Sequence, residues 1–158
     1  MVAITLADGS VREFDGEIDG FILAKNISTS LAKIVLAMKL DGEEVDLSTK
    51  ISKDSKVELI TSSSEEGLEI IRHDSAHIFA QAVKELYKDT QITIGPAIED
   101  GFYYDVLREE TFTPEDLVAI EVRMREIVKR NQAITREVWD RDEAIEFFKS
   151  IGEFYKAE

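Results

Sequence analysis

His73 and His77 are the only histidines of the chain, and they are four residues apart. They lie in a proline-free segment, residues 68–87, whose apolar residues recur at helical spacing. At 3.6 residues per turn, both imidazoles fall on one face of that helix. The opposite face carries its apolar residues, Ile71, Ile78, Phe79, Ala82 and Leu86. The histidines are therefore either a solvated surface pair or part of the wall of a cleft that other elements close.

Two histidines at this spacing suggest a metal site, but the surrounding residues argue against one. Asp74 follows His73, whereas the zinc-protease helix has glutamate at that position. A zinc centre needs at least a third protein ligand, and the chain has neither cysteine nor a third histidine. Carboxylates remain possible ligands. We expect no metal site and no disulfide within this chain.

A second candidate site lies in residues 94–105, where glycines bracket a predicted hairpin that carries three consecutive aromatic residues. Alternation along a strand places Phe102 and Tyr104 on one face and Tyr103 on the other. The segment is either a hairpin with ordinary aromatic packing or the floor of a pocket. In the second interpretation Gly95 permits a close backbone approach, and a tyrosine hydroxyl orients a ligand.

The charge of the chain restricts its partners. Nineteen Lys and Arg residues against 33 Asp and Glu residues give a net charge of −14. This is the wrong sign for a module that binds nucleic acid by neutralising phosphates. A basic cluster could contact phosphate but is more typical of a solvated helix face: Arg123, Arg125, Lys129 and Arg130. An RNA substrate would have to gain most of its affinity elsewhere.

The elements expected in residues 1–62 follow the order of a ubiquitin-like β-grasp domain. Residues 2–14 predict a hairpin with its turn at Asp8 and Gly9. Asp19 can cap a helix that reaches Ile27. Two strands joined by a turn at residues 41–42 follow, and residues 56–61 predict a closing strand.

The polar segment 62–67 predicts a boundary, so we expect a second domain over residues 63–158. Its expected elements are a helix over 68–87, a hairpin over 91–107, and a helix that begins at Thr113-Pro114 and ends near Asn131. A short strand over 134–139 and a helix over 142–151 complete a mixed α/β pattern. The whole chain is thus expected to be an α+β protein.

The first residues lack the basic segment and the apolar run of a signal peptide. No window approaches the roughly 18 apolar residues of a membrane helix. We therefore expect a cytoplasmic protein without a membrane partner.

Three blocks, HDSAHIFAQAVKELY, ITIGPAIEDGFYYDV and GEFYK, resemble successive parts of the editing domain of bacterial threonyl-tRNA synthetases. Residues 1–61 resemble the TGS domain that precedes it in that family. The resemblance covers essentially the whole chain in the right order. It implies hydrolysis of serine from seryl-tRNA that bears the threonine tRNA, a mistake that arises because serine lacks only one methyl group of threonine.

The resemblance also assigns site residues. His73, His77, Tyr104 and Lys156 match positions that line the editing pocket, and Gly95 matches its edge. Ester hydrolysis needs a positioned water, a proton acceptor and help for the developing oxyanion. The implied roles are proton handling for His73, water or oxyanion stabilisation for Lys156, and positioning for His77 and Tyr104.

In the family a Cys-x-x-x-His element completes the pocket, and none occurs before Glu158. The resemblance therefore implies a truncated editing domain, incomplete and weak or inactive by itself, with no cofactor of its own. It implies that the full-length enzyme ligates threonine to its tRNA with ATP, Mg and a catalytic-domain zinc. The implied partners are the acceptor end of the threonine tRNA, the remainder of the synthetase chain and a second copy in a homodimer.

Two other classes of function stay open. One is a noncatalytic TGS-containing adaptor that docks on RNA or protein. The other is a phosphohydrolase of the HD type, suggested by His73-Asp74, although such sites need further His and Asp ligands from several helices.

Overall fold

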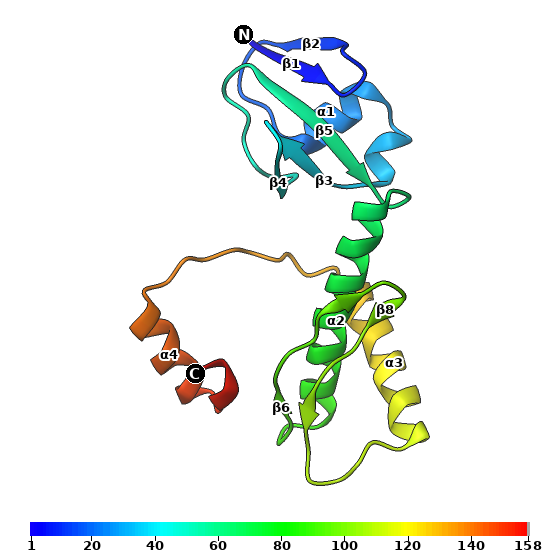
Figure 1. Ribbon diagram of the computed structural model, residues 1–158, viewed down its shortest axis with the longest axis vertical. Helices are drawn as coiled ribbons and strands as arrows, with labels where there is room; N and C mark the ends of the chain where they lie inside the picture. Colours follow the sequence, from blue (N-terminus) through cyan, green and yellow to red (C-terminus); the bar gives the residue numbers. More distant parts are fainter. Residues whose placement is uncertain (158) are drawn as a thin grey trace. The chain divides into compact units, whose positions relative to one another are not determined.

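The computed structural model describes residues 1–157 and divides into two compact units, Met1–Ile71 and a second unit that begins at Arg72 (Figure 1). Helix α2 (Glu65–Leu86) belongs to both, because the division falls inside it. The domain boundary expected at residues 62 and 63 stays a prediction. Within the described residues, no helix is long and apolar enough to cross a membrane.

The first unit is a five-stranded sheet with one helix packed on it. The sheet has the order β2-β1-β5-β3-β4. Its central pair, β1 and β5, is parallel, whereas the other pairs are antiparallel. This arrangement confirms the predicted β-grasp order. The elements are β1 (Val2–Leu6), β2 (Val11–Phe14), α1 (Gly20–Ile27), the 3-10 turn η1 (Leu31–Lys33), β3 (Val35–Leu40), β4 (Glu43–Asp46) and β5 (Ser55–Thr61).

Local sequence explains why these elements start and end where they do. The Asp19 side chain accepts a hydrogen bond from the Ile22 amide at 3.0 Å and so caps α1 as predicted. Asp41 and Gly42 both have positive φ, which suits the tight turn between β3 and β4. Leu23 of α1 is fully buried against the sheet, with Ile4, Met38 and Val57 in the same core.

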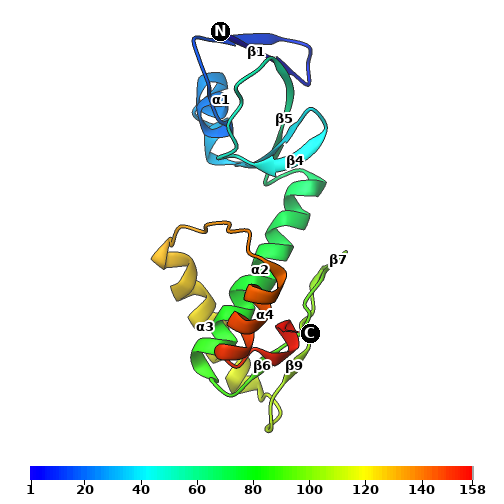
Figure 2. The ribbon, with the colours of Figure 1, turned by 90° about the vertical axis from the view of Figure 1, so that its left-hand side faces the viewer.

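The second unit is built on the C-terminal part of α2, with a hairpin and helix α3 (Pro114–Arg130) packed against it (Figures 1 and 2). The hairpin consists of two short ladders, β6 (Gln91–Ile92) with β9 (Val106–Leu107) and β7 (Ala97–Ile98) with β8 (Gly101–Phe102). The core of this second unit, called the second core below, comprises Ala82, Val83, Ile92, Ile120 and Ile127. The predicted hairpin and the predicted helices over 68–87 and from Thr113-Pro114 are confirmed.

The ends of α3 also match the prediction. Thr113 caps the helix with Pro114 in its first turn, and Asn131 ends it in the left-handed conformation at φ 46°.

The predicted strand over residues 134–139 is wrong. Residues 132–140 form neither helix nor strand between α3 and α4 (Arg141–Ser150), and all of them are exposed, with Ile134 at 96% (Figure 1). Alternating apolar residues form a strand only where another strand offers hydrogen-bond partners, and none pairs with this segment within residues 1–157. Helix α4 does form as expected, and Gly152 follows it with φ 78° before the 3-10 turn η2 (Phe154–Lys156).

Candidate functional site

The two histidines form a contact pair on the surface of α2. Their Nε2 atoms lie 3.0 Å apart, and the ring centroids are 4.7 Å apart with the planes at 72°. Both side chains are exposed, which confirms that they face away from the second core. A hydrogen bond between two ring nitrogens requires one to donate and the other to accept. A hydrogen bond of this kind can pass a proton from one imidazole to the other.

One member of the predicted apolar stripe does not join that core. Ile71 is 40% exposed, whereas Ile78, Phe79, Ala82 and Leu86 all pack in the second core or against it. Ile71 lies at the end of the first unit, on the stretch of α2 before the core begins.

Gly95 and Tyr104 are in direct contact across the hairpin. A Cβ atom at Gly95 would overlap the Tyr104 ring, so only glycine lets that ring lie against the backbone. Tyr104 and Phe102 both contact Phe79 of α2, with centroid distances of 5.8 and 5.9 Å, while Tyr103 is 51% exposed. The predicted strand alternation is confirmed. The group that approaches Gly95 is a tyrosine ring of the same hairpin.

The polar group that Tyr104 contributes at this position is its phenol hydroxyl. Burial, followed by the negative charge of Glu153, raises the pKa of the Tyr104 phenol. The phenol therefore stays neutral and can donate a hydrogen bond. Within residues 1–157 its hydroxyl has no hydrogen-bond partner.

Lys156 lies on the separate turn η2. Its ammonium nitrogen is 6.0 Å from the centroid of the Phe148 ring, and the side chain is exposed. No hydrogen bond or ring contact joins it to His73 or His77 in the described part of the chain. The structure therefore brings together the two histidines, and separately Gly95 and Tyr104, while Lys156 reaches neither pair directly.

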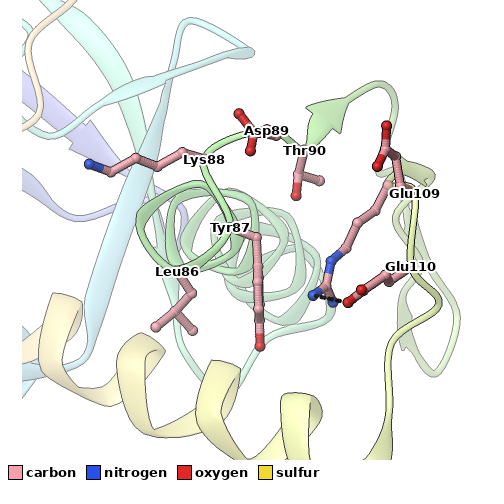
Figure 3. A pocket seen from close by; sticks show the side chains of 8 residues that line it. Leu86, Tyr87, Lys88, Asp89, Thr90, Glu109 and Glu110 are labelled. Carbon is pink, nitrogen blue, oxygen red and sulfur yellow. Dashed lines mark ion pairs between the residues drawn. The ribbon is translucent and has the colours of Figure 1, made fainter.

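A cavity of about 430 Å³ lies at the C-terminal end of α2 (Figure 3). None of the residues predicted to form the site lines it. Its walls are residues 86–90 from the end of α2 and the loop after it, and residues 108–110 after β9. Its one arginine, Arg108, is already engaged, because its guanidinium carbon lies 4.2 Å from the centroid of the Tyr87 ring and its nitrogens pair with Glu110 and Asp116.

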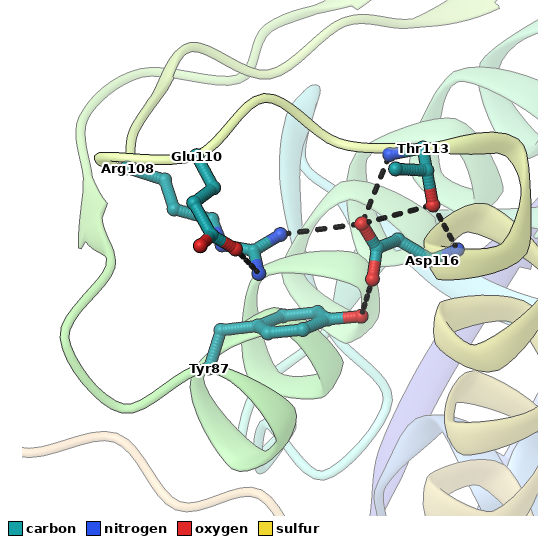
Figure 4. A network of polar contacts seen from close by, with 5 residues as sticks. All are labelled: Tyr87, Arg108, Glu110, Thr113 and Asp116. Atoms are coloured by element: carbon teal, nitrogen blue, oxygen red, sulfur yellow. Dashed lines mark hydrogen bonds and ion pairs between the residues drawn. The ribbon is translucent and has the colours of Figure 1, made fainter.

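Asp116 connects three elements beside this cavity (Figure 4). It accepts hydrogen bonds from the Tyr87 hydroxyl at 2.6 Å and from Arg108 at 3.3 Å, and it forms a capping box with Thr113. The hydrogen bond from Tyr87, then that from the Thr113 amide, lowers the pKa of Asp116 to about 2. This network therefore stabilises the packing of the start of α3 against the end of α2 and the segment after β9. Sequence reasoning identified the helix start at Thr113 but missed the long-range partners.

The basic cluster on α3 is largely neutralised within the chain. Arg123 and Arg130 both bind Glu85 of α2, at 3.1 and 2.6 Å, and Arg125 binds Glu121 at 2.6 Å. The hydrogen bond from Arg130, then that from Gln81, lowers the pKa of Glu85 to about 2. The cluster therefore stabilises the packing of α3 on α2. No group of three His, Cys, Asp or Glu side chains in residues 1–157 could hold a metal ion.

Comparison with known proteins agrees with the β-grasp fold of the first unit. Residues 2–61 match the family model described as "TGS domain". Over its full length the chain is 57% identical to a threonine–tRNA ligase of Rickettsia akari, 56% identical to that of Gluconobacter oxydans and 58% identical to that of Rhodospirillum rubrum. The chain spans about a quarter of the length of these relatives, 25%, 24% and 25% respectively.

The fold and this match define an α+β protein with an N-terminal TGS domain. More particularly, the chain is related over all its residues to the N-terminal region of the bacterial threonine–tRNA ligases. The resemblance found from its sequence motifs is thereby confirmed.

Proposed function

We propose that this chain forms the N-terminal region of a threonine–tRNA ligase and carries residues of the site that hydrolyses mischarged seryl-tRNA. The observation that carries the proposal is the exposed His73–His77 pair, with Nε2 atoms 3.0 Å apart, in a chain 56–58% identical to threonine–tRNA ligases. Two polar rings on a solvated helix face contribute nothing to a core, so their contact fits a role in binding or proton transfer.

The chemical need for such a site follows from the two amino acids. A synthetic site built for threonine also accepts serine, because losing one methyl group costs only about 1–3 kcal/mol of binding. A second site that hydrolyses the ester removes the error. In that reaction water attacks the carbonyl carbon, the bond to the ribose oxygen breaks, and serine leaves with a free carboxylate.

We assign roles to the candidate residues on this basis. His73 takes the proton of the attacking water and returns it to the ribose oxygen, and His77 holds the ring of His73 through their shared hydrogen bond. The Tyr104 hydroxyl, neutral and without a partner in residues 1–157, donates to the substrate beside Gly95. Lys156 supplies positive charge to the water or the oxyanion.

The remaining functions belong, in this proposal, to the regions of the relatives that this chain does not span. These are ligation of threonine to its tRNA with ATP and Mg, a catalytic-domain zinc, most of the tRNA contacts, and assembly into a homodimer. The acidic charge of the chain fits this division, because a net charge of −14 cannot hold the tRNA backbone by itself. We place the whole enzyme in the cytoplasm.

The test uses the full-length enzyme that contains this sequence. His73→Ala should slow single-turnover hydrolysis of seryl-tRNA by about 100-fold or more, while threonine activation stays unchanged because a separate domain performs it. Asp74→Asn, an exposed neighbour on the same helix, is the control and should leave both reactions unchanged. Equal loss of both activities in His73→Ala would contradict the proposal. Unchanged hydrolysis after both histidines are replaced would favour the adaptor alternative.

A further inference from the structure

Glu153 is an unusual residue of the second unit because it is a buried carboxylate with only 6% of its surface exposed. It lies between the end of α4 and Lys156, in the turn that forms η2. One of its oxygens, Oε2, is buried without a hydrogen-bond partner in residues 1–157. Burying a charged group is unfavourable unless a partner compensates, so its position needs a specific explanation.

The compensating partner is Lys84 of α2. Its ammonium nitrogen lies 2.6 Å from Oε1 of Glu153, and it also donates a hydrogen bond to the Thr90 carbonyl at 2.9 Å. The Glu153 side chain is 8% exposed and that of Lys84 31%, so the pair is partly shielded from solvent. Shielded pairs are screened less by water and salt than surface pairs. Lys84 therefore fixes Glu153, and with it the turn, to α2.

A second contact ties the same turn to the hairpin. The Gln91 side chain of β6 donates a hydrogen bond to the Gly152 carbonyl at 3.1 Å, across 61 residues of sequence. The Lys156 amide in turn donates to the Glu153 carbonyl at 3.1 Å. The backbone that carries Lys156 is thus bound directly to the backbone of the anchored residue.

Glu153 is also close enough to Tyr104 to act on it, since its charge is the second cause, after burial, of the raised pKa of the Tyr104 phenol. The ion pair with Lys84 and the Gln91–Gly152 hydrogen bond hold this turn to α2, which carries the histidines, and to β6, in the hairpin that carries Tyr104. Lys156 has no direct contact with the histidines or with Tyr104 in the described residues. Glu153 supplies the connection that Lys156 itself lacks.

We propose that Glu153, held by Lys84, is a positioning residue that fixes the backbone of Lys156 relative to α2 and the hairpin, which carry the other residues of the proposed editing site. This inference rests on the proposed function, because it assigns how one group of that site is held. Glu153 itself touches no substrate. Without the anchor, this turn would keep its contacts with α4, such as the hydrogen bond from the Glu153 amide to the Phe148 carbonyl, and the Gln91 contact with the hairpin, but it would lose its ion pair with α2. Lys156 would then move relative to the helix that carries the histidines.

The test compares variants of the full-length enzyme in single-turnover hydrolysis of seryl-tRNA. Glu153→Gln keeps the shape but removes the charge, and Lys84→Met removes the partner. Each should lower the maximal hydrolysis rate by about 10- to 100-fold, with the half-saturating enzyme concentration within about twofold and threonine activation unchanged. Lys84→Arg, which keeps the cation, should restore most of the rate.

The matched control is Glu146→Gln, which removes the ion pair of Glu146 with Lys149 on α4. Both side chains of that pair are exposed, Glu146 at 74% and Lys149 at 52%, so the change should leave hydrolysis unaltered. A readout independent of activity is hydrogen exchange in the full-length enzyme. Glu153→Gln should speed exchange in residues 150–157 and leave α2 and α3 protected.

The outcomes separate this inference from the function on which it rests. Normal hydrolysis in Glu153→Gln and Lys84→Met, with loss of hydrolysis in His73→Ala, would contradict the positioning role of Glu153 but would still support the proposed editing function. Normal hydrolysis in His73→Ala would contradict the proposed function itself. Faster exchange throughout α2 and α3 in both variants would show that the pair only stabilises the fold, and this too would overturn the positioning role.

Discussion

The Nε2 atoms of His73 and His77 lie 3.0 Å apart on successive turns of α2, with their ring planes at 72°. At this distance a hydrogen bond joins the two rings, with one Nε2 donating and the other accepting. Replacing either residue removes the same hydrogen bond. The two side chains are therefore expected to act as a unit.

The first prediction follows from this coupling. In the full-length enzyme, His77→Ala should slow hydrolysis of seryl-tRNA by about 10-fold or more. The double variant with His73→Ala should be slower than the more damaged single variant by less than about threefold, because groups that act together are not additive. Single-turnover kinetics on all three variants measures this. Effects that multiply would show that the histidines act independently.

The second prediction concerns the contact between Gly95 and Tyr104. Gly95→Ala places a Cβ atom inside the volume of the Tyr104 ring, and the displaced ring should cost about 1–3 kcal/mol of stability. Gly16→Ala is the control, since no atom lies within 4 Å of a Cβ at that position and its φ is not in the left-handed region. Urea denaturation of the 158-residue chain compares them. A loss at Gly16 as large as that at Gly95 would disprove the steric argument.

The third prediction is acid sensitivity of the second unit. The pKa of Glu85 falls from 4.5 to about 2, chiefly through the Arg130 hydrogen bond, and that of Asp116 falls from 3.8 to about 2, chiefly through the Tyr87 hydrogen bond. Carboxylates with a lowered folded-state pKa stabilise the protein above their unfolded pKa, and the stabilisation is lost as the pH falls toward the folded value. Stability should thus decline between about pH 5 and pH 2.

The decline is measured as the urea midpoint at successive pH values. Glu85→Gln and Asp116→Asn should each lower the midpoint at neutral pH and flatten its fall in acid. Glu99→Gln, at an exposed carboxylate in the hairpin turn, should give the same dependence of the urea midpoint on pH as the unsubstituted chain. An equally steep fall in all three variants would show that neither network is the source.

The fourth prediction tests the core of the TGS domain. Leu23 is fully buried between α1 and the sheet, so Leu23→Ala should cost about 2–5 kcal/mol of stability. Phe21, on the same helix, is 56% exposed, and Phe21→Ala should change stability by no more than about 0.5 kcal/mol. Circular dichroism during urea denaturation follows both. Similar losses in the two variants would contradict the assigned orientation of α1.

Much of the fold was predictable because its signals are local. The Asp41-Gly42 turn, the Asp19 cap and the Thr113-Pro114 helix start each depend on the backbone preferences of a few neighbouring residues. The strand over residues 134–139 failed for the opposite reason. Its residue types suit a strand, but a strand exists only when a partner supplies hydrogen bonds, and that partner is not a local property.

The contacts of the candidate site also fall into local ones, which the sequence predicts, and long-range ones, which it does not. The amino-acid sequence by itself determined that His73 and His77 share a helix face, because 3.6 residues per turn place positions four apart side by side. Only the tertiary structure decided that the Tyr104 ring fills the space at Gly95 and that Lys84 anchors Glu153 beside Lys156. Such contacts join distant residues, and they depend on how whole elements pack, which the spacing of residues within one element does not contain.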